Sequence, residues 1–163
     1  MAMNRAEPDL LRTIRRILLG LVLLGIVGLV PELLLLKHTE SVSQIIPFVV
    51  LAFGLVSSAV VWVRPTRRSL RAFQGIMLVF IVAGVVGLYL HFRGNVEFEL
   101  EQDPSAHGLD LLWRSLSGGI PTLAPGAMVQ LGLLGLAFAY RHPALRPAQR
   151  ASGSASITPE EVP

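Results

Sequence analysis

A few polar residues inside long apolar blocks are the first candidates for chemistry. Glu32 is the one ionisable residue within such a block, and residues of this kind mark proton or substrate pathways in membrane proteins. It lies about 24 Å along a hydrocarbon core of about 30 Å, so its carboxylate can reach the outer headgroups. Gln130 falls at the middle of another block, where we expect its amide to bond across helices to Ser57 or Ser58.

Two histidines and nearby carboxylates raise the question of a metal or haem site. His38 and His91 each follow an apolar block, and Glu97 and Glu99 lie just beyond His91. Imidazole and carboxylate groups bind zinc and other divalent ions, and two imidazoles can hold haem iron. No His-x-x-His or Glu-x-x-His motif accompanies them. We therefore predict no cofactor and keep these four residues only as metal-ligand candidates.

Small and aromatic residues mark expected packing and interface positions. Glycines three residues apart share a helix face and form a strip where another backbone can approach closely. Such pairs occur at Gly25 and Gly28, at Gly84 and Gly87, and at Gly132 and Gly135. Trp62, Trp113 and Tyr140 are expected at the membrane–water interfaces, where amphipathic rings are enriched.

Four uninterrupted apolar blocks must position these residues. The chain has 163 residues, of which 52% are apolar and 15% charged. The blocks cover 17–36, 45–63, 72–90 and 120–140, and each has a length of about 30 Å as a helix, which matches the hydrocarbon core. The sequence therefore predicts an all-α integral membrane protein, a four-transmembrane-helix bundle with short loops, in which 17–142 form the membrane domain.

The positive charges predict how the chain is oriented. Eleven of the fourteen Lys and Arg residues lie in 1–16, 64–71 and 141–150, whereas the opposite side has only Lys37, Arg93 and Arg114. The positive-inside rule then places the N-terminal segment 1–16 and the C-terminal tail in the cytoplasm. This distribution explains the basic pI without a nucleic-acid partner. The tail 143–163 is rich in Pro, Ala and Ser and is expected to be disordered.

The outer loop, 91–119, is the only sizeable part expected outside the bilayer. Apolar and acidic residues alternate over 96–101, which is a strand-like pattern. Leu109, Leu112, Trp113 and Leu116 then recur at helical spacing and predict a short amphipathic helix on the membrane surface. Glycines and prolines between 118 and 126 predict a kinked or partly unwound start to the fourth span.

The functional expectation follows from what the chain lacks. Without cysteine, thiolate catalysis and thiolate-held metals are excluded, and no nucleophile motif indicates an enzyme. We expect a non-enzymatic accessory subunit that packs with partner membrane helices or with itself. The alternatives are a small oligomeric transporter or channel using Glu32 and Gln130, and a metal- or haem-binding protein using His38 and His91. The Arg-rich composition is typical of a bacterium, so the cytoplasmic (inner) membrane is the expected location.

Overall fold

The fold consists of helices and connecting turns. The computed structural model describes residues 3–37, 39 and 41–146, and these residues contain no strand. The elements in chain order are α1 (Met3–Leu35), α2 (Val42–Val63), α3 (Arg67–Gln102), α4 (Gly108–Leu116), α5 (Gly126–Ala139) and the 3-10 turn η1 (Pro143–Leu145). The prediction of an all-helical protein is confirmed for this part of the chain.

Three of the described helices are long and apolar enough to cross a membrane. The qualifying segments are Asp9–Leu35, Val42–Val63 and Arg67–Gln102, and their most apolar 18-residue windows have mean hydropathies of 2.5, 2.3 and 2.3. Only 17%, 33% and 17% of their most apolar windows are buried inside the protein. A helix of a water-soluble core keeps its exposed side polar, so these helices suit a lipid environment.

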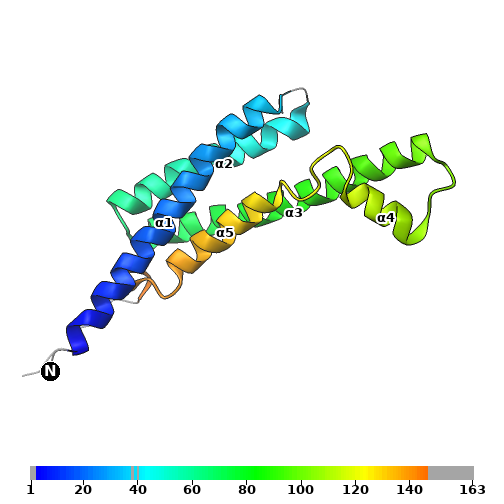
Figure 1. The fold of residues 1–163 in the computed structure, drawn as a ribbon. Helices are drawn as coiled ribbons and strands as arrows, with labels where there is room; N and C mark the ends of the chain where they lie inside the picture. The colour runs from blue at the N-terminus through cyan, green and yellow to red at the C-terminus, as the bar shows by residue number, and fades with distance from the viewer. Residues whose placement is uncertain (1–2, 38, 40, 147–163) are drawn as a thin grey trace, which may run out of the picture.

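The three long helices and the shorter α5 form two antiparallel pairs (Figure 1). Helix α1 lies beside α2, and α3 lies beside α5. The pairs pack together near the connection between α2 and α3 and diverge toward the tip between α1 and α2 (Figure 1). That connection is short because Thr66 caps α3: its Oγ1 accepts from the Ser69 amide at 3.1 Å, and its own amide donates to Ser69 Oγ at 2.9 Å.

One apolar core joins these four helices. Its buried positions recur every three or four residues, as the helical period requires; they include Leu19, Val22 and Ile26 on α1, Leu51 and Val61 on α2, Leu70, Phe73, Met77 and Phe80 on α3, and Leu131 and Phe138 on α5. The rings of Phe73 and Phe138 meet edge to face, with centroids 5.6 Å apart. The core therefore lies near the end of the molecule where the two pairs are closest.

The helix bounds differ from those of the predicted spans, and the fourth predicted span is the one that the helix fills least. Helix α1 includes all but the last residue of the first predicted span and continues through Pro31. The fourth predicted span, 120–140, contains only the 14 residues of α5, preceded by turns from 117 to 125. An α-helix of that length is about 21 Å long, shorter than the hydrocarbon core. The expected unwound start of this span is confirmed, and it is longer than one turn.

The strand-like prediction for 96–101 is wrong, because α3 continues as a helix to Gln102. Alternation over six residues is too short to outweigh helix propagation from a preceding apolar span. The helix is also supported there by an Arg93–Glu97 ion pair one turn apart, with Nε and Oε1 separated by 2.8 Å. The third span thus extends well into the segment expected to be a loop.

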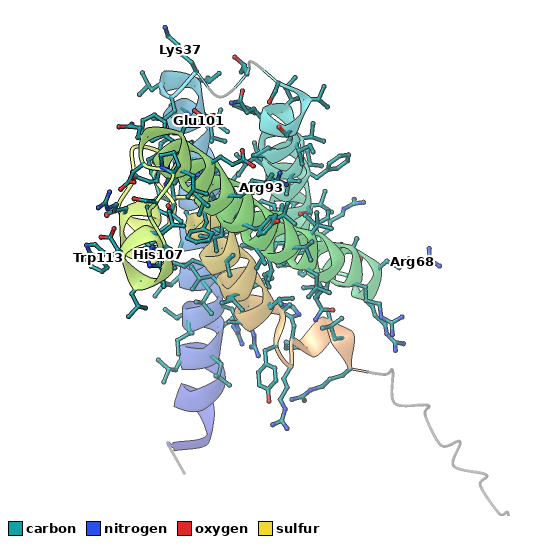
Figure 2. All side chains as sticks on the ribbon, turned by 90° about the vertical axis from the view of Figure 1, so that its right-hand side faces the viewer. Lys37, Arg68, Arg93, Glu101, His107 and Trp113 are labelled. Carbon is teal, nitrogen blue, oxygen red and sulfur yellow. The ribbon has the colours of Figure 1, made fainter. Side chains whose placement is uncertain are left out.

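Helix α4 forms where the amphipathic pattern predicts a helix, and it folds back beside the end of α3 (Figure 1). Its small polar residue Ser115 is fully buried against the rest of the protein. Leu109 and Trp113 are instead 82% and 72% exposed, and Trp113 points away from the bundle (Figure 2). The apolar face of α4 is therefore free to meet a membrane surface or another chain.

Candidate functional site

The polar candidates within the spans do not form a common site. Glu32 and Gln130 are exposed on α1 and α5, respectively. Ser57 and Ser58 are buried on α2, where Ser57 Oγ donates to the Gly54 carbonyl at 3.1 Å and Ser58 Oγ has no hydrogen-bond partner. The expected bond from Gln130 to either serine is absent, because Gln130 faces outward while the serines face the interior.

The candidate metal ligands are also separated. His91 is half-buried on α3, with Nδ1 2.9 Å from the Pro121 carbonyl oxygen, and Glu97 pairs with Arg93. Since α3 is helical here, Glu97 and Glu99 differ by about 200° around its axis and cannot point to one ion. His38 lies outside the described residues. Within the described part of the chain, no group of three His, Cys, Asp or Glu residues is placed to hold a metal ion.

Four of the predicted packing glycines lie between α3 and α5. A Cβ added to Gly84 would meet the Pro125 carbonyl oxygen at 2.9 Å, and one added to Gly132 would meet the Met77 carbonyl oxygen at 2.7 Å. At these two positions only glycine fits without moving a backbone. A Cβ added to Gly87 or Gly135 would instead meet the side chains of Pro125 and Met77, respectively.

The first glycine pair is divided between two environments. Gly25 faces the Leu131 side chain of α5, so it belongs to the packing between α1 and α5. A Cβ added to Gly28 would meet nothing within 4 Å. Gly28 therefore lies on a side of α1 that no other described element covers.

The most developed polar cluster is centred on Asn95 of α3, which the sequence did not single out. Asn95 is only 1% exposed. Its Nδ2 lies 2.9 Å from the Ser115 carbonyl oxygen, 2.8 Å from the Ile120 carbonyl oxygen and 2.9 Å from Thr122 Oγ1, and its Oδ1 accepts from the Ile120 amide at 3.1 Å. One side chain thus connects α3, the end of α4 and the irregular segment before α5.

The cluster supplies hydrogen bonds that the irregular segment cannot make by itself. Backbone groups outside a helix must find other partners when water is excluded. Asn95 and His91 meet the backbone of Ile120 and Pro121, while Thr122 Oγ1 donates to the Ser115 carbonyl at 3.1 Å. This arrangement orders the segment; it leaves no free amide group on Asn95 for a substrate.

The three predicted interface aromatics are exposed on separate elements. Trp62 lies near the end of α2 and Tyr140 directly after α5, with exposures of 55% and 67%. The guanidinium carbon of Arg141 lies 5.6 Å from the centroid of the Tyr140 ring, within the range of a cation–π contact. Trp113 of α4 lies on the other side of the membrane in the predicted topology, so the three rings are consistent with two interfacial belts.

Comparison with known proteins finds no counterpart for this arrangement. No protein-family model, curated protein or solved structure matches the chain.

Proposed function

We propose that the chain is a non-enzymatic subunit of a bacterial cytoplasmic membrane, where it packs against partner membrane helices or further copies of itself. In this proposal it crosses the bilayer four times, with both termini in the cytoplasm. The observation that carries it is the uncovered side of α1, where a carboxylate and a glycine lie among exposed leucines and valines.

The uncovered side of α1 follows the helical period. Leu24, Val27 and Leu35 are 69%, 56% and 83% exposed. Gly28 and Glu32 are exposed between them. Residues at this spacing share one face of a helix.

This face suits a helix partner better than lipid alone. Gly28 lets a second backbone approach closely, as glycines do at contacts between membrane helices. Glu32 lies near the outer end of the first predicted span, and a polar group on a partner helix would offer its carboxylate a hydrogen bond across the helix contact. The transport alternative gains no comparable support, since Glu32 and Gln130 are exposed on different helices and share no hydrogen bond.

The polar cluster supports a fourth crossing despite the shortness of α5. Non-helical backbone is tolerated at membrane depth only where protein covers it and satisfies its polar groups. Asn95 and His91 provide such bonds to residues 120 and 121. The turns and α5 together then cover the distance that α5 alone does not.

The absence of cysteine allows a direct test of the topology. Single substitutions Lys37→Cys, Ser105→Cys, Arg68→Cys and Arg146→Cys can each be labelled with a membrane-impermeant maleimide on intact spheroplasts. We expect labelling at the first two positions only, with Arg68→Cys and Arg146→Cys reacting after lysis. Labelling of Arg146→Cys from outside, with Arg68→Cys protected, would show that α5 does not cross.

Photo-cross-linking tests the partner interface. A photoreactive amino acid at Leu24 should give a protein–protein adduct on denaturing gels, and mass spectrometry of that adduct would show whether the partner is another protein or a second copy. Leu78 is the matched control, because it is 54% exposed on α3. If Leu24 gave only lipid adducts, or if Leu78 alone captured protein, the assignment of the α1 face would be wrong.

A further inference from the structure

Four arginines from distant parts of the chain surround a hollow where α1 meets the end of α5. The hollow is lined by Leu11, Arg12, Arg15, Arg141, Pro143 and Arg146. An adjoining hollow shares Arg141 and Arg146 and adds His142 and Leu145. We call the two together the arginine hollow. The segment after α5 that lines it lies beside the N-terminal half of α1 (Figure 1), whereas Lys37 lies at the other end of α1 (Figure 2).

The local fold brings these arginines together. Arg15 Nη2 donates to the Arg141 carbonyl oxygen at 3.3 Å and so ties α1 to the segment after α5. Arg12 precedes Arg15 by three residues and shares its helix face. Arg141 has a φ of 48°, in the left-handed region that side chains rarely adopt, and it turns the chain into η1. Arg146 directly follows that turn.

The arginine hollow is poorly neutralised by the described residues. The one ion pair at this place joins Arg12 Nη2 to Asp9 Oδ1 at 3.5 Å, and both side chains are 69% exposed. Among the side chains that the structure describes, four guanidinium groups here thus share one ion pair. The half-buried ring of His142 responds to the same field, because burial and then the charge of Arg15 lower its pKa. An anion in the hollow would relieve the repulsion among the guanidinium groups.

The hollow also has an apolar edge, which indicates what kind of anion fits. Leu11 is 44% exposed at its rim, and Leu10 and Ile14 of the same helix are 60% and 42% exposed. Guanidinium groups match the geometry of phosphate oxygens and bind them through paired hydrogen bonds. A phosphate with an attached acyl chain would use both the guanidinium groups and this apolar edge.

We infer that the arginine hollow is a binding site for the phosphodiester headgroup of an anionic phospholipid. The inference rests on the proposed topology, which places this end of the chain in the cytoplasmic leaflet. Basic pockets beside membrane helices on that side bind anionic headgroups. The guanidinium groups of Arg12, Arg15, Arg141 and Arg146 contact the phosphate, and Leu11 and Leu145 contact the glycerol and the start of the acyl chains.

Native mass spectrometry of the full chain in detergent micelles tests the inference. The protein is titrated with phosphatidylglycerol and, separately, with phosphatidylcholine. The test variant combines Arg12→Gln with Arg146→Gln, which leaves the Arg15 bond to the Arg141 carbonyl intact. The control combines Arg67→Gln with Arg68→Gln, which removes the same charge from the same predicted membrane side but outside the hollow.

We expect the unmodified chain to bind phosphatidylglycerol in preference to phosphatidylcholine. The test variant should bind phosphatidylglycerol about thirty-fold more weakly than the unmodified chain does, which corresponds to about 2 kcal/mol for two arginines. The affinity of the control for phosphatidylglycerol should stay within about twofold of that of the unmodified chain. Equal losses in the two variants would show general attraction to a negative surface and overturn the inference. So would a lack of preference between the two lipids.

A second arm separates a lipid from a soluble phosphate. Glycerol 3-phosphate, which has the phosphate without acyl chains, should displace bound phosphatidylglycerol only at a concentration at least a hundredfold higher. Displacement at equal concentration would assign the hollow to a soluble anion. If the arginine hollow does not bind the lipid, the Leu24 cross-linking and maleimide results are unchanged, so failure of this inference is distinguishable from failure of the proposed function.

Discussion

Replacing Asn95 with alanine should loosen the irregular segment before α5 while leaving the apolar core intact. Asn95 bonds to groups of Ser115, Ile120 and Thr122. Ser115 and Thr122 keep their mutual bond of 3.1 Å in the variant. The Ile120 amide loses its one described partner, and the Ile120 carbonyl keeps only a contact of 3.5 Å with Thr122 Oγ1. The loss is thus concentrated at one residue.

The expected loss of unfolding free energy follows from the hydrogen bonds that Ile120 loses. An unsatisfied buried backbone group costs about 1–3 kcal/mol, and the side chain of Ile120 is 42% exposed, so partial access for other partners reduces the cost. We expect Asn95→Ala to lower the free energy of unfolding by about 2 kcal/mol. For a chain of this length the corresponding fall in Tm is about 4–8 °C.

Thermal unfolding in detergent and hydrogen–deuterium exchange together measure this effect. Amide exchange should accelerate in 117–126 and remain slow in 70–84. Gln102→Ala is the matched control, since Gln102 is an exposed amide residue at the end of the same helix. If Asn95→Ala unfolded at the same temperature as Gln102→Ala and left exchange in 117–126 unchanged, the proposed role of the cluster would be refuted.

Two further predictions concern helix packing and pH. Gly132→Leu should destabilise the fold by about 3 kcal/mol, because the new side chain would collide with the Met77 carbonyl. Gly28→Leu should change the stability of the isolated chain by less than about 0.5 kcal/mol. Thermal unfolding in detergent compares the two variants, and equal effects would contradict the assigned packing. His142 has a lowered pKa from burial and the charge of Arg15, so the unfolded chain binds its proton more readily and stability should fall as the pH drops below the ordinary value of 6.5. A Tm series from pH 8 to 5 measures this, and His142→Asn should flatten the slope.

The sequence predicted the helices from physical constraints that act locally. A long apolar run has few alternatives to a helix in lipid, so the positions of α1, α2 and much of α3 follow from composition alone. The period of Leu109, Leu112 and Leu116 likewise predicted α4. It could not show which face of α4 packs inward, because an apolar face turned toward lipid and one turned toward a core have the same pattern.

Asn95 escaped prediction because its role depends on residues 20 to 27 positions later in the chain. A single asparagine carries no motif, and its neighbours in the alternating pattern of 96–101 indicated a strand. The available signal was indirect: the glycines and prolines of 118–126 predict backbone groups without helical partners, and such groups require donors and acceptors from another element. A polar residue just beyond the third apolar block is then a candidate to provide them.

Three features of the fold depend on one another: the length of α3, the break before α5 and the position of α4 beside α3. Because α5 begins only at Gly126, the preceding backbone needs cover and hydrogen bonds that a helix would have provided internally. Helix α3 continues beyond its apolar span and thereby brings His91 and Asn95 to that backbone, and α4 returns along α3 so that Ser115 closes the other side. Ending α3 at residue 94 would therefore disturb the segment before α5 more than the connection between α3 and α4.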